Sequence, residues 1–269
     1  MAKYKKKRAR ELQHDRFRDT TMSFFDRLGD ALEGKGRTIL YGLGGALLAA
    51  ILIVGFVKWR HKKSEEALTA LGSAIAITKA PVMTTPIAGN TELTFPSDVE
   101  RAQKAIAEFE KVAAKYGDPY RTESRYFIAS NRLVLDRAKG LSELAELSNS
   151  NITEVATLSK FALAQAKESD GQFDEAVKLY TDIAKLNSPA VSPDTANLRL
   201  AKVYEKQGKK KEAADVLFNI VDASRKAKGA DNQPLPTSAA AREAASELQK
   251  LDPDRYAQLP PETPPVLAG

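Results

Sequence analysis

Residues 161–187 read FALAQAKESDGQFDEAVKLYTDIAKLN, and residues 198–224 read LRLAKVYEKQGKKKEAADVLFNIVDAS. The two stretches align without a gap at a constant offset of 37 residues, which indicates an internal repeat. In each copy, apolar side chains recur at three- and four-residue spacing on both sides of a central glycine. That spacing is typical of two amphipathic helices joined by a short turn. The repeat therefore predicts antiparallel helical hairpins.

The positions that the two copies share are those that packed helices require. Alanines let two helices approach closely, glycine forms the turn between them, and larger apolar side chains fill the space between successive hairpins. The repeat-defining core residues are Leu163, Ala164, Gly171, Ala176, Tyr180, Leu200, Ala201, Tyr204, Gly208 and Ala213, of which the first-helix tyrosine, Tyr204, occurs in the second copy only.

This pattern resembles a tetratricopeptide repeat, whose usual period of about 34 residues is lengthened here by the insertion SPAVSPD before the second copy. The segment AIAEFEKVAAKYG at 105–117 indicates an earlier unit. We expect helices over 97–115, 120–139 and 141–147, and a polar-faced final helix over 237–251 that closes the stack. The predicted fold class is all-α: a tetratricopeptide-like helical-hairpin solenoid over 97–252, followed by a disordered Pro-rich tail over 253–269.

A second stretch decides how the chain is organised before this domain. Residues 38–57, TILYGLGGALLAAILIVGFV, contain no charged side chain. A helix of that length spans roughly 30 Å, the thickness of the hydrocarbon core of a bilayer. The run is too long, and too far from residue 1, for a cleaved signal peptide, so we expect one uncleaved transmembrane helix. The residues expected at the membrane interface are Tyr41, Lys58, Trp59, Arg60, Lys62 and Lys63.

The flanks of the predicted span set its orientation. Within 20 residues of the span each side carries four Lys or Arg residues, and the further basic cluster at residues 3–10 breaks this tie. The positive-inside rule then places the N-terminus in the cytoplasm and the large domain across the membrane. The basic tail over 1–37 contains an amphipathic pattern around Phe24 and Leu28. It is either a helix on anionic headgroups or simply a topology signal.

Residues 58–96 are expected to hold a membrane-proximal helix, which continues the anchor over 64–77, and then a loop with three prolines. Inside the span, Gly42, Ala46 and Ala50 have the small-xxx-small spacing that lets two helices pack in lipid. They predict a possible helix partner or homodimer.

The charge of the chain, +6 overall, is unevenly distributed. The tail holds 11 Lys and Arg against 6 Asp and Glu, and residues 58–63 add four basic residues. The rest has 26 basic against 29 acidic residues, a net charge of −3, so no nucleic acid partner is expected for the domain. Cysteine is absent, the two histidines flank the span, and no catalytic motif occurs. We therefore expect no enzyme activity, no cofactor and no metal site.

The short tail, single span and degenerate repeats together resemble the YfgM-like group of bacterial proteins. The resemblance implies an ancillary subunit of the Sec translocon in the inner membrane, with repeats in the periplasm that bind translocon components, chaperones or secreted clients. Two alternatives stay open: a structural envelope protein that organises cell-wall or division machinery, and a cytoplasm-facing adaptor of inverted topology.

In a helical stack, the first helix of each hairpin lines a concave face. The predicted partner contacts there are Phe161, Gln165, Glu168, Leu198, Lys202 and Glu205. Phe161 and Leu198 would be exposed apolar groups unless an N-terminal helix folds over them.

Overall fold

The computed structural model describes residues 36–83, 93–186, 188–230 and 232–262, with side chains from residue 47 onward. The chain divides into two units, Met1–Glu66 and Ala67–Gly269. The amphipathic tail, the side chains of Tyr41, Gly42 and Ala46, and residues 263–269 lie outside the described residues.

Helix α2, Gly36–Lys79, contributes residues to both units. In the first unit its large apolar side chains are exposed, from Leu47 at 65% to Val57 at 44%. Over the part of the chain that the structure describes, no helix is both long enough and apolar enough to cross a membrane. Because the side chains of residues 38–46 fall outside that part, the transmembrane helix stays a prediction.

In the second unit, the end of α2 packs against α3, Asp98–Lys115. The cap of α3 is as expected, because the Ser97 hydroxyl accepts a hydrogen bond from the Glu100 amide at 3.2 Å. Ala67, Leu71 and Ala74 are buried in one cluster with Phe109 of α3. The compact unit therefore begins at Ala67, and the apolar face of the predicted membrane-proximal helix packs onto α3.

Helices α4, Tyr120–Leu135, and α5, Arg137–Leu147, replace the predicted helix over 120–139 and the short helix after it. The break falls at Asp136, whose backbone is extended and whose carboxylate accepts a hydrogen bond from the Lys139 amide at 3.0 Å. An N-cap aspartate thus ends one helix and starts the next without a loop. Gly140 permits the sharp turn, because a Cβ there would lie 2.8 Å from the Leu133 backbone nitrogen.

The repeated sequence forms two helical hairpins, as predicted. The first is α6, Thr153–Ser169, with α7, Phe173–Lys185; the second is α8, Pro193–Lys206, with α9, Lys210–Lys226. Gly171 and Gly208 form the two turns at φ +72° and +75°, the left-handed region that glycine adopts at little cost. Their amides donate equivalent hydrogen bonds to the Glu168 and Glu205 carbonyls.

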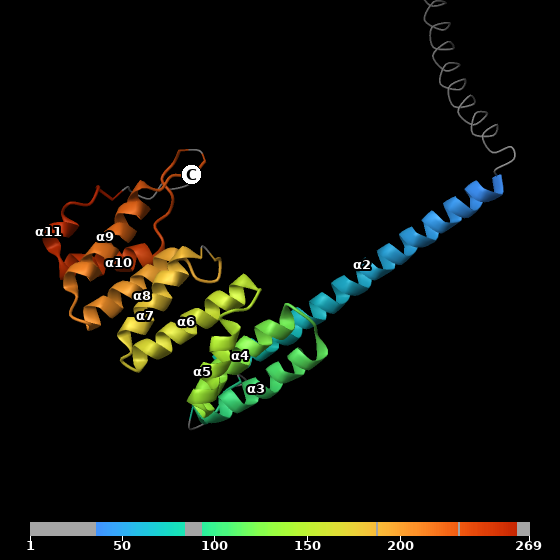
Figure 1. Ribbon diagram of the computed structural model, residues 1–269, viewed down its shortest axis with the longest axis horizontal. Coiled ribbons are helices and arrows are strands. Elements are labelled where there is room, and N and C mark those ends of the chain that lie inside the picture. The colour runs from blue at the N-terminus through green and yellow to red at the C-terminus, as the bar shows by residue number, and fades with distance from the viewer. Residues whose placement is uncertain (1–35, 84–92, 187, 231, 263–269) are drawn as a thin grey trace, which may run out of the picture. The chain divides into compact units, whose positions relative to one another are not determined.

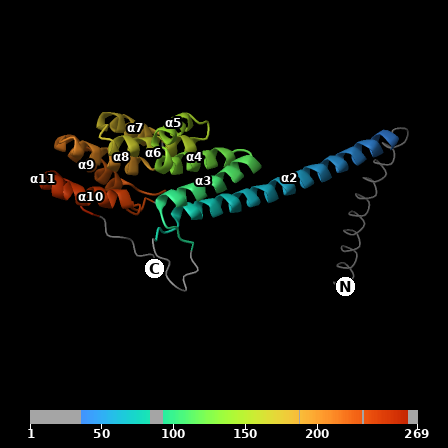
Figure 2. The same cartoon turned by 90° about the horizontal axis from the view of Figure 1, so that it is seen from below.

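Successive hairpins pack in sequence order, from α3 in green to α10 in red (Figures 1 and 2). Leu163 packs towards α4 and α5, whereas Tyr180 and Ile183 pack towards α8. The stack closes with α10, Ala239–Leu251, and the short α11, Pro253–Tyr256.

The C-terminal segment departs from the disordered tail predicted from residue 253. Residues 253–256 are helical and Leu259 is 8% exposed, packed in one cluster with Ala244 and Leu248 of α10. The Arg225 guanidinium also donates a hydrogen bond to the Pro260 carbonyl. Burial of Leu259 and this hydrogen bond hold residues 257–260 against the stack, although the prolines of this segment predicted an irregular tail.

Candidate partner-binding surfaces

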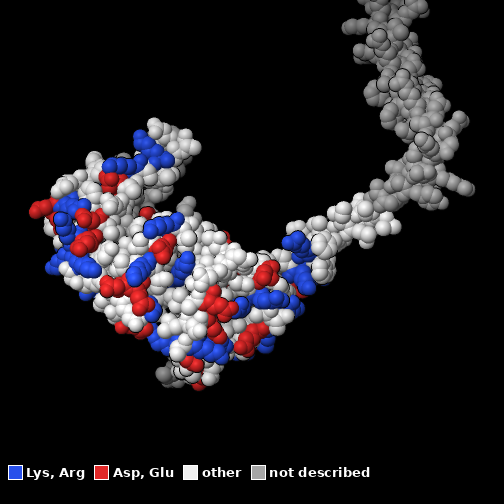
Figure 3. All heavy atoms as spheres, viewed as in Figure 1, with Lys and Arg blue, Asp and Glu red and all other residues white. Residues whose placement is uncertain are grey.

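The first helices of the hairpins form one layer of the stack. Helix α4 contacts α6, and α8 contacts α10, in addition to the contacts between consecutive helices. Alternate helices lie next to one another in this way when hairpins stack in parallel register. Acidic and basic side chains are interspersed over the face of α6 to α10 seen in Figure 3.

The two apolar residues predicted on this layer are not both available to a partner. Leu198 is 6% exposed, because Ala241, Ala244 and Leu248 of α10 pack against it. Phe161 is half-buried, with its ring edge-on to Tyr180 at a centroid distance of 5.7 Å. The cover over Leu198 is therefore the C-terminal α10, not the N-terminal helix that the sequence allowed.

Glu168 is also internal. Its carboxylate accepts hydrogen bonds from the Tyr180 hydroxyl at 3.0 Å and from the Lys206 ammonium at 2.5 Å. Burial and the neighbouring Glu168 charge raise the pKa of Tyr180, so the phenol keeps its proton and remains a donor. Glu168 thus joins α6, α7 and α8, and it is a structural residue rather than a partner contact.

The remaining predicted contacts are exposed or half-buried. Gln165 is exposed on α6, and Lys202 of α8 forms an ion pair with Glu243 of α10. Glu205 is half-buried, and its Oε1 is shielded from solvent and has no hydrogen-bond partner among the described residues. Burial raises the pKa of the Glu205 carboxyl, and the charge of Glu247 raises it further, against the opposing effect of Lys202 and Lys250.

We call this surface the α8–α10 charged face: Lys202, Glu205, Glu243, Glu247 and Lys250. Sequence reasoning missed its three α10 members because 237–251 was assigned only the role of closing the stack. The spacing of Glu243, Glu247 and Lys250, four and three residues apart and so on one helix face, was the available signal.

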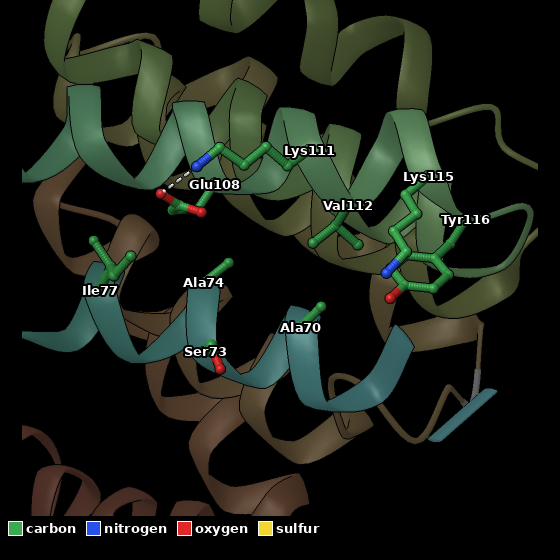
Figure 4. Close-up of a pocket in the computed structure, with 9 residues that line it drawn as sticks. All are labelled: Ala70, Ser73, Ala74, Ile77, Glu108, Lys111, Val112, Lys115 and Tyr116. Atoms are coloured by element: carbon green, nitrogen blue, oxygen red, sulfur yellow. Dashed lines mark hydrogen bonds and ion pairs between the residues drawn. The ribbon is translucent and has the colours of Figure 1, made fainter. Parts of the chain in front are cut away.

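A second surface is the groove between the end of α2 and α3, which the sequence did not predict. A cavity of about 400 Å³ lies there, with Ala70, Ala74 and Ile77 of α2 facing Val112 of α3 (Figure 4). Its rim is charged: Glu108 pairs with Lys104 and Lys111, each at 2.8 Å. Hydrogen bonds from these two lysines lower the pKa of Glu108. A second cavity of about 510 Å³ adjoins it at Ile77.

The predicted interface residues with described side chains are all exposed in the first unit. Phe56 and Trp59 lie with ring centroids 6.0 Å apart, and the Lys63 ammonium lies 4.9 Å from the centroid of a Trp59 ring. Among the residues described, no three His, Cys, Asp or Glu side chains gather where they could hold a metal ion.

No protein-family model and no curated protein sequence matches the chain. Among solved structures, the chain is similar to a Podosopora anserina protein described as kinesin light chain nearly identical TPR-like repeats. The identity is 20%, the match covers 59% of this chain and 81% of that one, and the TM-score is 0.43. The chain's own repeated turns and inter-hairpin cores make residues 67–262 an all-α domain of tetratricopeptide-like helical hairpins.

Proposed function

We propose that this chain is a membrane-anchored, non-catalytic adaptor whose helical hairpins bind protein partners at a membrane complex, the Sec translocon. Stacked hairpins support the protein-binding part, because such stacks present one layer of helices as an extended recognition surface. The observation that carries it is the α8–α10 charged face, whose side chains Lys202, Glu243, Glu247 and Lys250 remain 31–68% exposed.

The membrane part of the proposal is supported by the sequence of residues 38–57 and by the exposure of its described half. Leu47, Leu52 and Phe56 are 58–65% exposed on one helix. Apolar side chains of this size, left in water, forfeit roughly 1.5–3 kcal/mol each relative to burial. Lipid would supply that burial. The placement that follows is a single pass through a bacterial inner membrane, with the N-terminus in the cytoplasm and the repeats in the periplasm.

The translocon and periplasmic chaperones are proposed as partners because the sequence resembles the YfgM-like group. The absence of catalytic motifs supports a role in recognition instead of chemistry. The adaptor would hold a client or partner near the machinery without altering it covalently.

Affinity purification of the full chain in mild detergent tests the partner. We expect translocon subunits to be recovered, together with periplasmic chaperones. Recovery of cell-wall or division enzymes without translocon subunits would replace this proposal with the structural envelope role.

Two further measurements test the placement. Carbonate washing should leave the chain in the membrane fraction, and release into the aqueous fraction would refute the anchor. Protease added to spheroplasts should digest the repeat domain. Protection of the domain would establish the inverted, cytoplasm-facing topology.

A further inference from the structure

The segment that follows the predicted span carries the most concentrated charge in the described part of α2. Lys58, Arg60, Lys62 and Lys63 fall within six residues, and all four side chains are exposed. The nearest acidic residues follow only at Glu65 and Glu66. A cluster of four positive charges on two helical turns creates a local potential that attracts anions.

Three side chains of this segment are ordered along one face of the helix. Phe56, Trp59 and Lys63 are three and four residues apart, so they share a face. The ring contact at 6.0 Å and the ammonium–ring distance of 4.9 Å confirm that they form a column. Along the axis this column passes from an apolar ring to an indole and then to an ammonium. That is also the order of environments from hydrocarbon through interface to headgroups.

The other basic residues lie beside this column. At about 100° per residue, Lys62 and Arg60 project on opposite sides of this column, and Lys58 lies further around the helix beyond Lys62. The charges therefore spread around more than half of the helix. A single carboxylate of a protein partner could meet only one or two of them, whereas a layer of anionic headgroups meets them all. The long stems of Lys and Arg can also reach such a layer from slightly different depths.

We propose that residues 56–63 bind the headgroups of anionic phospholipids, with Trp59 at the interface and the four basic side chains on the phosphates. This inference rests on the proposed membrane anchor and adds the class of lipid. It also explains why a strongly basic cluster stands on the side of the span that bears the large domain. Each basic residue held at an anionic surface favours the charged lipid by roughly fivefold at low salt, and screening reduces this.

Trp59 gives a direct readout because it is the only tryptophan in the chain. The full chain would be reconstituted in phosphatidylcholine vesicles that contain 20% phosphatidylglycerol. In one sample the phosphatidylglycerol carries bromine near the headgroup end of its acyl chains; in the other, an equal amount of phosphatidylcholine does. Bromine quenches only a nearby indole, so the ratio of the two quenching values measures which lipid surrounds Trp59. The basic tail at residues 3–10 would act on the opposite leaflet and would not affect this ratio.

We expect brominated phosphatidylglycerol to quench roughly three- to tenfold more effectively per molecule, with the preference falling as salt rises. Replacing Lys58, Arg60, Lys62 and Lys63 with Gln should abolish the preference. The matched control replaces four exposed lysines of the repeat domain, Lys178, Lys185, Lys210 and Lys211, and should retain it.

Each other result is decisive. Equal quenching by both lipids, or equal loss in the control variant, would overturn the lipid preference and leave the anchor intact. No quenching by either lipid would show that Trp59 is not at a bilayer, and the anchor itself would then fail.

Discussion

The two repeated hairpins have a glutamate at the same position, but its surroundings differ between them. Glu168 of α6 is buried and accepts hydrogen bonds from Tyr180 and Lys206. Glu205 of α8, 37 residues later, has an unpartnered oxygen and a like charge, Glu247, nearby. Both donors are lost at the equivalent positions, because Leu217 stands 37 residues after Tyr180 and Glu243 stands 37 residues after Lys206.

The two glutamates therefore differ in whether they stabilise the stack of helices. A buried carboxylate with two donors joins three helices, whereas the half-buried Glu205 carboxylate has a buried oxygen that no described residue satisfies, which lowers stability. The sequence predicted both residues as partner contacts, and of the two only Glu205 remains partly exposed.

The largest effect is expected from removing the tyrosine that makes the first hairpin different. Tyr180 is fully buried, and Tyr180→Ala would leave a large cavity between α7 and α8 and remove a donor from Glu168. We expect a loss of about 3–5 kcal/mol in the free energy of unfolding, measured by urea denaturation. A loss below about 1 kcal/mol would contradict the packing described for this site.

Removing only the hydroxyl isolates the polar contribution. Tyr180→Phe keeps the ring but leaves the buried Glu168 carboxylate with one donor fewer, so we expect a loss of about 1–3 kcal/mol in the free energy of unfolding. Tyr204→Phe, in the half-buried tyrosine of α8, is the control and should change stability by less than about 0.5 kcal/mol. Equal effects of the two substitutions would mean that the Glu168 network adds nothing.

Substitution of either turn glycine should lower the stability by a similar amount, because the two turns, unlike the two glutamates, have equivalent surroundings. Gly171→Ala and Gly208→Ala both force a side chain into the left-handed region, at a cost of about 1–2 kcal/mol each. Thermal unfolding of the two variants should give similar decreases in Tm. A large decrease for one and none for the other would show that the two turns are not equivalent.

The smallest expected effect is the pH dependence of the stability that Glu205 contributes. Its pKa is raised above 4.5, so the folded state holds this proton more tightly than the unfolded state does. The resulting penalty is present above the folded pKa and disappears as pH falls towards 4.5. Glu205→Gln should therefore be as stable as wild type or slightly more stable at pH 7, and wild type should gain on it during acidification. A gap in the free energy of unfolding that does not change with pH would contradict the raised pKa.

Much of the fold was predictable because short sequence patterns determine it. The repeat, its two turn glycines and the Ser97 cap follow from spacing and residue type alone. Asp136 was missed because one polar residue on an amphipathic helix looks the same whether it is exposed or capping the next helix. The residues from Ala67 continue the helix of the predicted span, as expected, but their apolar face gave no indication that α3 covers it.

The site was less predictable than the fold because exposure is a tertiary property. Leu198 lies on the correct layer, but α10, which covers it, comes more than 40 residues later in the chain. Likewise, Glu168 and Glu205 have the same local sequence position, and only the residues that reach them from other helices distinguish them. Lys202 and Glu205 were predicted from helical spacing, whereas the structure was needed to show that Glu243 of α10 lies beside Lys202.

Site-specific photo-crosslinking in cells would test partner binding by the first-helix layer most directly. A crosslinking amino acid placed at Gln165, Lys202 or Glu247 should capture the same partner, with translocon subunits among the products. The same amino acid at Lys178 of α7 or Lys211 of α9, both exposed on the second helices, should capture that partner at least about tenfold less often. Capture of the partner from the second helices alone, or equally from all five positions, would contradict partner binding by the first-helix layer.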